Sequence, residues 1–154
     1  MVDYFKEAEN LLYSVPKKEE AIKQMTRRKE RLLKRMGPSM PHGADFARSY
    51  TKASFQGEAI NEVCALAELI SSIENAAAEL AEIKACVDAI TDEKLRTLLK
   101  CWYWGRLSKE KIAEKIDVWS VTTVYTKRNE AVSAFALLYY GKRVEAEQKK
   151  KRKN

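Results

Sequence analysis

Five polar side chains with useful chemistry gather in one short stretch, between a polar turn and an apolar helical pattern. They are Ser120, Thr122, Thr123, Thr126 and Lys127. Small hydroxyl groups can exchange hydrogen bonds with the edges of bases, and an ammonium group can neutralise a phosphate. The chemistry that this set offers is therefore recognition of a nucleic acid rather than bond-making catalysis.

The segment that carries these residues, 91–141, reads as three short helices joined by two tight turns. Thr91 is expected to cap the first helix, with Asp92 and Glu93 favourably placed at the positive end of its dipole. Gly105 is expected to end that helix, and Ser108 to cap the second. Apolar residues recur at steps of three and four in both helices. They are Leu95, Leu98, Leu99 and Trp102 in the first, and Ile112, Ala113 and Ile116 in the second.

The second turn and the third helix complete a helix-turn-helix pattern. Asp117 suits a turn that needs unusual backbone angles, and Ser120 is the expected cap of the third helix. The inward side of that helix is expected to comprise Val121, Val124, Ala131, Phe135 and Leu138. The hydroxyl residues fall largely off this side, where a recognition helix meets base edges. The alternative reading is an ordinary piece of a helical bundle.

The charge of the chain is unevenly distributed. The net charge is +7, and from Thr91 onward 16 Lys and Arg stand against 8 Asp and Glu. The first ninety residues hold 13 basic and 14 acidic residues, so the whole excess accompanies the helix-turn-helix pattern. Such an excess is typical of a polyanion-binding protein, although it does not distinguish DNA from RNA or an anionic membrane.

The first ninety residues read as helices that support this segment. Residues 3–13 and 16–36 are expected to be separate helices, because Ser14-Val15-Pro16 interrupts the pattern. Residues 37–55, with the lone His42, read as a loop. Residues 56–90 form the longest predicted helix, with a coiled-coil-like seam. The seam is Ile60, Val63, Ala67, Ile70, Ala77, Leu80, Val87 and Ile90. The basic helix 16–36 and the acidic helix 56–90 are expected to pair as a hairpin.

Several classes are disfavoured. An enzyme is the least favoured, since the chain has one His, no glycine-rich phosphate loop and no paired catalytic carboxylates, so no catalytic residue and no cofactor is expected. Cys64, Cys86 and Cys101 lack metal-ligand spacing and lie at helical, partly apolar positions, so buried, reduced thiols without a metal are expected. The chain opens without a signal-peptide pattern and has no bilayer-spanning apolar run, so we expect a cytoplasmic location and no membrane partner.

Four stretches resemble small helix-turn-helix transcriptional regulators of phages and prophages, of the ArpU/RinA type, whose C-terminal part is similar to region four of bacterial sigma factors. The stretches are ITDEKLRTLLKCWYWG with the following LSKEKIAEKI, TVYTKRNEAVSAFA, SMPHG after a basic helix, and the opening YFKEAENLLYSVP. They span most of the chain, and the specific part is the C-terminal half.

The resemblance implies sequence-specific binding of double-stranded DNA and transcriptional regulation, most often activation, in the nucleoid of a bacterial host. By position, it also assigns Tyr125 and Arg128 to the DNA-reading helix, and Lys109 and Lys111 to the flanks of the helix that contacts the backbone. Two departures matter. Trp119 occupies the usual place of a Ser or Thr cap, and Val121 replaces a frequent Arg, so specificity is expected to depend on the hydroxyls, Lys127 and Arg128.

The sequence thus predicts an all-α protein with an N-terminal helical hairpin over 1–90, a trihelical DNA-binding domain over 91–141 and a disordered basic tail over 142–154. The alternative function is a coiled-coil adaptor that docks RNA polymerase or another phage or host protein. Self-association through the seam between Ile60 and Ile90 is a third role, since such DNA readers often pair to match two half-sites.

Overall fold

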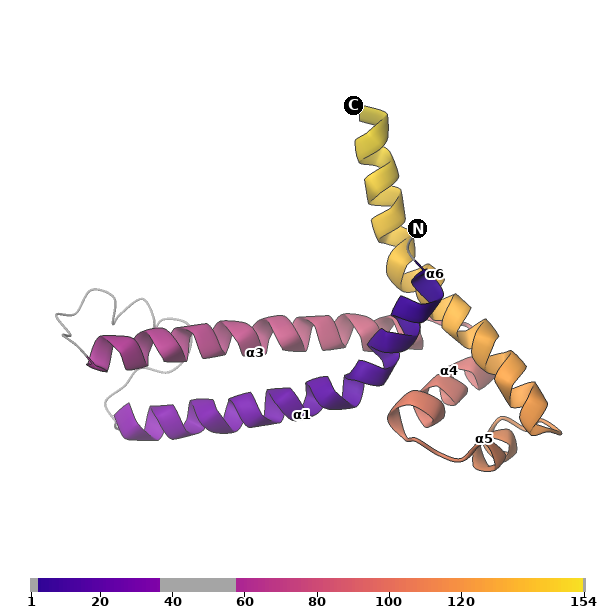
Figure 1. Ribbon diagram of the computed structural model, residues 1–154, viewed down its shortest axis with the longest axis horizontal. Helices are drawn as coiled ribbons and strands as arrows, with labels where there is room; N and C mark the ends of the chain where they lie inside the picture. Colours follow the sequence, from indigo (N-terminus) through magenta and orange to yellow (C-terminus); the bar gives the residue numbers. More distant parts are fainter. Residues whose placement is uncertain (1–2, 37–57, 154) are drawn as a thin grey trace. The chain divides into compact units, whose positions relative to one another are not determined.

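The computed structural model describes the backbone of residues 3–36 and 58–153 and the side chains of residues 3–36 and 60–141. The regular structure in these residues is helical, which confirms the all-α prediction (Figure 1). The helices are α1 (Tyr4–Met36), α3 (Glu58–Asp88), α4 (Glu93–Leu99), the π-helix η1 (Lys100–Trp104), α5 (Lys109–Lys115) and α6 (Val121–Lys153). The loop predicted over 37–55, with His42, lies outside the described residues. Over those same ranges, no helix has both the length and the apolar character to cross a membrane.

The chain divides into two compact units. Unit 1 comprises Met1–Lys17 and Leu80–Asn154, and unit 2 comprises Lys18–Glu79. Helices α1 and α3 therefore each contribute residues to both units. The sequence analysis placed the boundary at residue 90, where the helical pattern of residues 91–141 begins, and therefore assigned the start of α1 and the end of α3 to the N-terminal part.

Unit 1 has one continuous apolar core to which all of its helices contribute. Both α4 and α5 pack against α6. The start of α1 and the end of α3 add their own apolar side chains to the same core. Its largest fully buried side chains are Leu12, Ile83, Leu98, Leu99, Tyr103, Ile112 and Phe135. The predicted inward residues of α4 and α5 are all buried, as expected from their spacing.

Helix α1 runs without interruption through Pro16, so the break predicted at residues 14–16 is wrong. Proline lacks an N–H, which leaves the carbonyl four residues earlier without its helical partner. That carbonyl belongs to Leu12, and the indole N–H of Trp104 donates to it at 3.1 Å. A side chain from η1 thus supplies the hydrogen bond that the proline removes.

Within unit 2, α1 and α3 lie side by side (Figure 1). Leu32 of α1 and Leu66 of α3 form a small buried cluster. Lys18 pairs with Glu79 at 2.6 Å, and Arg35 approaches Glu62 at 3.9 Å, so the two segments run antiparallel.

The predicted seam of α3 is only partly buried. Val63 is buried, but Ile60 is 42% exposed and Ala77 is exposed. Leu66, which lies off the predicted heptad, is fully buried. A single heptad assignment fails because α3 contacts different neighbours in the two units.

Most helix ends follow local signals. Ser108 caps α5 by accepting a hydrogen bond from the Lys111 N–H, and Gly105 ends η1, both as predicted. Asp92 rather than Thr91 caps α4, because its carboxylate accepts from the Lys94 N–H at 2.9 Å.

The second half of α6 differs from the prediction at two places. The helix continues to Lys153, whereas residues 142–154 were expected to lack regular structure. Those residues are mainly Lys, Arg, Glu, Gln and Ala, which have high helix propensity. Leu138, expected on the inward side, is 38% exposed, because Phe135, Tyr139 and Tyr140 fill the core there.

Candidate nucleic-acid interface

A short, well-bonded turn joins α5 to α6. Asp117 adopts φ 56°, the left-handed conformation that Asp tolerates better than most residues. The Val118 N–H then donates to the Ala113 carbonyl at 3.0 Å. Ser120 caps α6, as predicted, since its hydroxyl accepts from the Thr123 N–H at 3.3 Å. The turn therefore fixes the direction in which α6 begins.

The hydroxyl residues at the start of α6 lie mainly on its solvent side. Ser120, Thr122 and Thr126 are exposed, and Tyr125 is 43% exposed. The Thr126 hydroxyl donates to the Thr122 carbonyl at 3.3 Å, while its lone pairs stay open to solvent. Thr123 is half-buried, and its hydroxyl lies 3.0 Å from that of Ser120. The structure thus brings four predicted contact residues to the surface and turns the fifth toward the cap.

Three of the predicted cations remain near the surface. Lys111 is exposed. Lys127 keeps 34% of its side chain exposed and pairs weakly with Glu130, at 3.5 Å. The ammonium of Lys109 lies 3.6 Å above the ring of Trp102, which in turn makes an edge contact with Tyr125 of α6. This aromatic pair holds a cation of α5 beside the first turns of α6.

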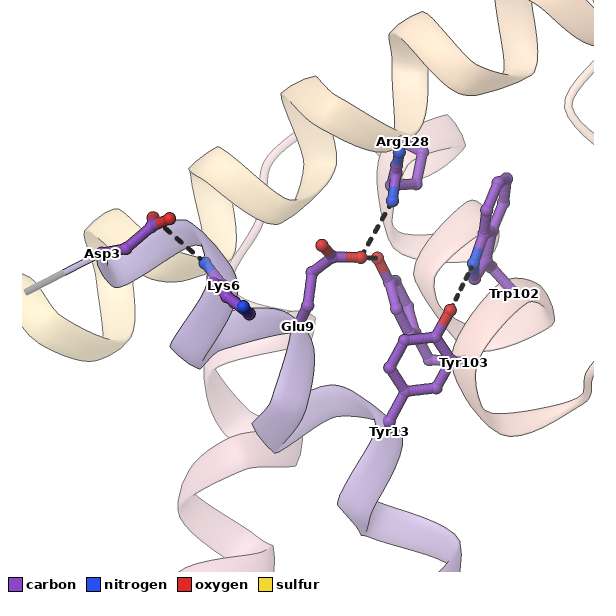
Figure 2. Close-up of polar contacts among 7 residues, drawn as sticks. All are labelled: Asp3, Lys6, Glu9, Tyr13, Trp102, Tyr103 and Arg128. Atoms are coloured by element: carbon purple, nitrogen blue, oxygen red, sulfur yellow. Dashed lines mark hydrogen bonds and ion pairs between the residues drawn. The ribbon is translucent and has the colours of Figure 1, made fainter.

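Arg128, the fourth predicted cation, turns inward instead. Its guanidinium donates to the carboxylate of Glu9 in α1 at 2.8 Å, and both side chains are only 21% exposed (Figure 2). It also lies over the ring of Trp102, at 5.1 Å. Its Nε is buried with no hydrogen-bond partner among the described residues. In this arrangement Arg128 anchors α6 to α1 and does not face solvent with the hydroxyl residues.

The same carboxylate accepts a second hydrogen bond. The hydroxyl of Tyr103, which is fully buried, donates to Glu9 at 2.9 Å (Figure 2). Burial, and then the hydrogen bond to Glu9, raise the pKa of Tyr103 far above its ordinary value. Burial would lower the pKa of Arg128, but the oxygen atoms of Tyr103 and Glu9 outweigh it and the pKa is raised. Within this cluster, Tyr103 is therefore neutral and Arg128 is charged at physiological pH.

Two residues near this surface were not assigned a contact role from the sequence. Glu9 lies four residues after Phe5 and three before Leu12, so a carboxylate occurs within an apolar stripe. Such a position signals a buried cationic partner, although the sequence does not say which one. Trp119 was treated only as a departure from the cap pattern, yet it is fully exposed, at 103%.

Within residues 3–36 and 58–153, no three His, Cys, Asp or Glu side chains group as metal ligands. The expected burial of the three thiols is wrong for Cys64, which is exposed, while Cys86 and Cys101 are half-buried. The features of this surface are thus hydroxyl groups, cations and aromatic rings.

Comparison with known proteins identifies the family. Residues 60–136, half of the chain, match the family described as protein of unknown function (DUF1492), and the chain belongs to it. No curated protein and no solved structure matches the chain. The matched residues include α4, α5 and the part of α6 that carries the hydroxyl groups.

Proposed function

We propose that this member of the DUF1492 family binds duplex DNA through the start of α6 and regulates transcription. In this proposal α5, the turn and α6 act as a helix-turn-helix, and the first turns of α6 enter the major groove. The resemblance to phage regulators of the ArpU/RinA type and to sigma region four supports a promoter-binding role, with activation as the expected direction.

The observation that supports the proposal most is the exposure of the hydroxyl residues. The Ser120 cap would stabilise the start of any helix, but Thr122 and Thr126 place two further hydroxyl groups on the solvent side of the same turns. Ser120, Thr122 and Thr126 offer both donors and acceptors there, as recognition of base edges requires. Lys111 and Lys127, which are at least partly exposed, can contact the phosphates on either side.

The structure changes the role that we propose for Arg128. A guanidinium that pairs with Glu9 and stacks near Trp102 would have to lose both contacts to reach a base. We therefore assign Arg128 to holding α6 in place, and we leave base readout to the hydroxyl groups and phosphate contact to the lysines.

The test is binding of the full chain to a duplex that it selects from a random-sequence pool. Lys127→Ala is expected to weaken binding and to reduce the slope of log K against log salt by about one unit, since one phosphate contact is lost. Lys23→Ala removes the same charge from an exposed position of α1 in unit 2 and is the matched control.

The hydroxyl groups are tested by the double substitution Thr122→Val and Thr126→Val, which keeps the side-chain shape. It is expected to reduce the preference for the selected duplex over a scrambled one and to leave the salt slope unchanged. The assigned face is wrong if the double variant keeps the wild-type preference for the selected duplex and Lys127→Ala keeps the wild-type salt slope. Failure to select any duplex would reject DNA binding altogether.

A second candidate function, the protein-binding adaptor, is favoured by a different observation. Tyr4, Phe5, Leu137 and Tyr140 line an open, mainly apolar hollow of about 460 Å³ in unit 1, and Leu137 is 76% exposed. An exposed apolar hollow suits a side chain of a partner protein such as RNA polymerase. Leu137→Asp is expected to abolish co-purification with bacterial RNA polymerase if this function operates, and to leave DNA binding unchanged.

A further inference from the structure

Trp119 stands apart from the other tryptophans of this chain. Trp102 is 6% exposed and donates to the Tyr13 hydroxyl at 3.2 Å, and Trp104 donates to the Leu12 carbonyl. Trp119 is fully exposed, and among the described residues it makes no ring contact and no hydrogen bond. Tryptophan is highly buried on average, so an indole that is wholly in water leaves a large apolar surface unused.

The indole is presented by a firm piece of backbone. Val118, directly before it, is half-buried, and its N–H is bonded to the Ala113 carbonyl. Ser120, directly after it, caps α6. Trp119 therefore lies between the bond that caps the end of α5 and the residue that caps the start of α6, so the turn that sets the direction of α6 also sets the backbone position of Trp119.

The surroundings favour a nucleic acid over an apolar protein surface as the partner of this ring. The exposed hydroxyls of Ser120 and Thr122 follow it immediately along the chain. Lys109 is held at the start of α6 through the rings of Trp102 and Tyr125, and Lys111 is exposed on α5. Lysines and hydroxyl groups around one aromatic ring match a polyanion that also carries apolar groups.

We infer that Trp119 packs against thymine methyl groups at the edge of the major groove when α6 binds DNA. The C5-methyl of thymine is the apolar group that the major groove displays, and it distinguishes an A·T pair from the others. Trp119 then supplies the base discrimination that is missing where Val121 replaces a frequent Arg. This inference rests on the proposed function and adds a base preference to it.

The experiment uses the full chain and the duplex that it selects from a random-sequence pool. Trp119→Ala is expected to weaken binding about tenfold or more, with an unchanged salt slope because no charge is removed. Leu138→Ala removes another exposed apolar side chain of unit 1, outside the hollow that Leu137 lines, and is expected to bind as the wild type does. Both variants are expected to keep the wild-type melting temperature, since neither residue belongs to the core.

Replacing each thymine in turn by uracil then removes one methyl group at a time. For the wild-type protein, uracil at one or two of these positions is expected to lower the affinity for the duplex about fourfold, which corresponds to about 0.8 kcal/mol for a lost methyl. In Trp119→Ala the same replacements are expected to change nothing. Two results would overturn the inference without affecting the proposal of DNA binding. One is that uracil replacement lowers the affinity of Trp119→Ala as much as it lowers that of the wild type, and the other is that Trp119→Ala binds with wild-type affinity. If no duplex is selected, the proposed function fails and this inference fails with it.

Discussion

Glu9, near the start of α1, forms an ion pair with Arg128, in the second turn of α6, at 2.8 Å. The two residues are 119 positions apart in the chain. Because Tyr103 of η1 also donates to Glu9, one carboxylate connects three helices of unit 1. The helix that we propose to read DNA is therefore positioned by the opening residues of the chain.

Removing either partner of this pair should destabilise unit 1. We expect Glu9→Gln and Arg128→Met each to lower the free energy of unfolding by about 1–3 kcal/mol, since a partly buried polar group loses its partner. The double variant should lose less than the sum, with a coupling energy of about 1 kcal/mol or more in a double-mutant cycle measured by urea unfolding. Glu62→Gln breaks the exposed contact with Arg35 and should cost less than about 0.5 kcal/mol. Strict additivity at Glu9 and Arg128 would contradict the pairing.

The start of α1 should behave as core rather than as a detachable arm. Leu12 is fully buried and Leu137 is 76% exposed. Leu12→Ala is expected to cost about 2–5 kcal/mol through lost burial and a cavity. Leu137→Ala should stay within about 0.5 kcal/mol of the wild type. Thermal and urea unfolding measure both. Equal effects of the two substitutions would show that residues 4–17 do not pack in unit 1.

Tyr103 should make stability depend on alkaline pH. Its pKa is raised in the folded state, chiefly by burial, so the native chain keeps a proton that the unfolded chain loses near pH 10. Its contribution is complete below about pH 10 and is lost as the pH rises toward the folded pKa, by at most about 1.4 kcal/mol per pH unit.

Tyr103→Phe lacks this group and isolates its contribution, because other titrations are common to both proteins. We expect the wild type to have the larger free energy of unfolding in urea at pH 8, because Tyr103→Phe lacks the hydrogen bond to Glu9. This difference between the two proteins should shrink as the pH rises to 11. Parallel curves over the whole range would contradict a raised pKa for Tyr103.

The bond between Trp104 and Leu12 should be needed only because residue 16 is proline. Trp104→Phe removes the donor to the Leu12 carbonyl, and we expect a loss of about 1–3 kcal/mol. In a Pro16→Ala background the Ala N–H can bond that carbonyl, so the same substitution should cost distinctly less. Trp119→Phe, at the exposed tryptophan, is the control and should not change stability. An equal cost of Trp104→Phe in both backgrounds would disprove this compensation.

The parts of the fold that the sequence predicted correctly depend on local chemistry. Ser108 and Ser120 were identified as caps because a side-chain oxygen satisfies N–H groups within the same helix turn. Asp117 was placed in the turn because few residues tolerate its backbone angles, and Gly105 was placed at a helix end. The exposure of Thr122 and Thr126 followed from the helical period alone.

The parts that the sequence did not predict depend on partners that are distant in the chain. Pro16 looked like a helix break because the indole of Trp104 cannot be foreseen from residues 4–36. Arg128 looked like a free cation because the acceptor, Glu9, belongs to another helix. Leu138 and Tyr139 are equally plausible as core from periodicity, and only the packing of α6 decides between them. The role in DNA binding stays a prediction for every residue to which we assign it.

Because Ala8 and Leu12 share one core with Phe135 and Tyr139, the core of unit 1 cannot be completed during translation until α6 has left the ribosome. The start of α1 is synthesised first and stays without its packing partners in α6 until those residues have been translated. A nascent chain that stops before α6 would lack the core as well as the surface that we propose for DNA, so interrupted synthesis should leave no half-active fragment behind.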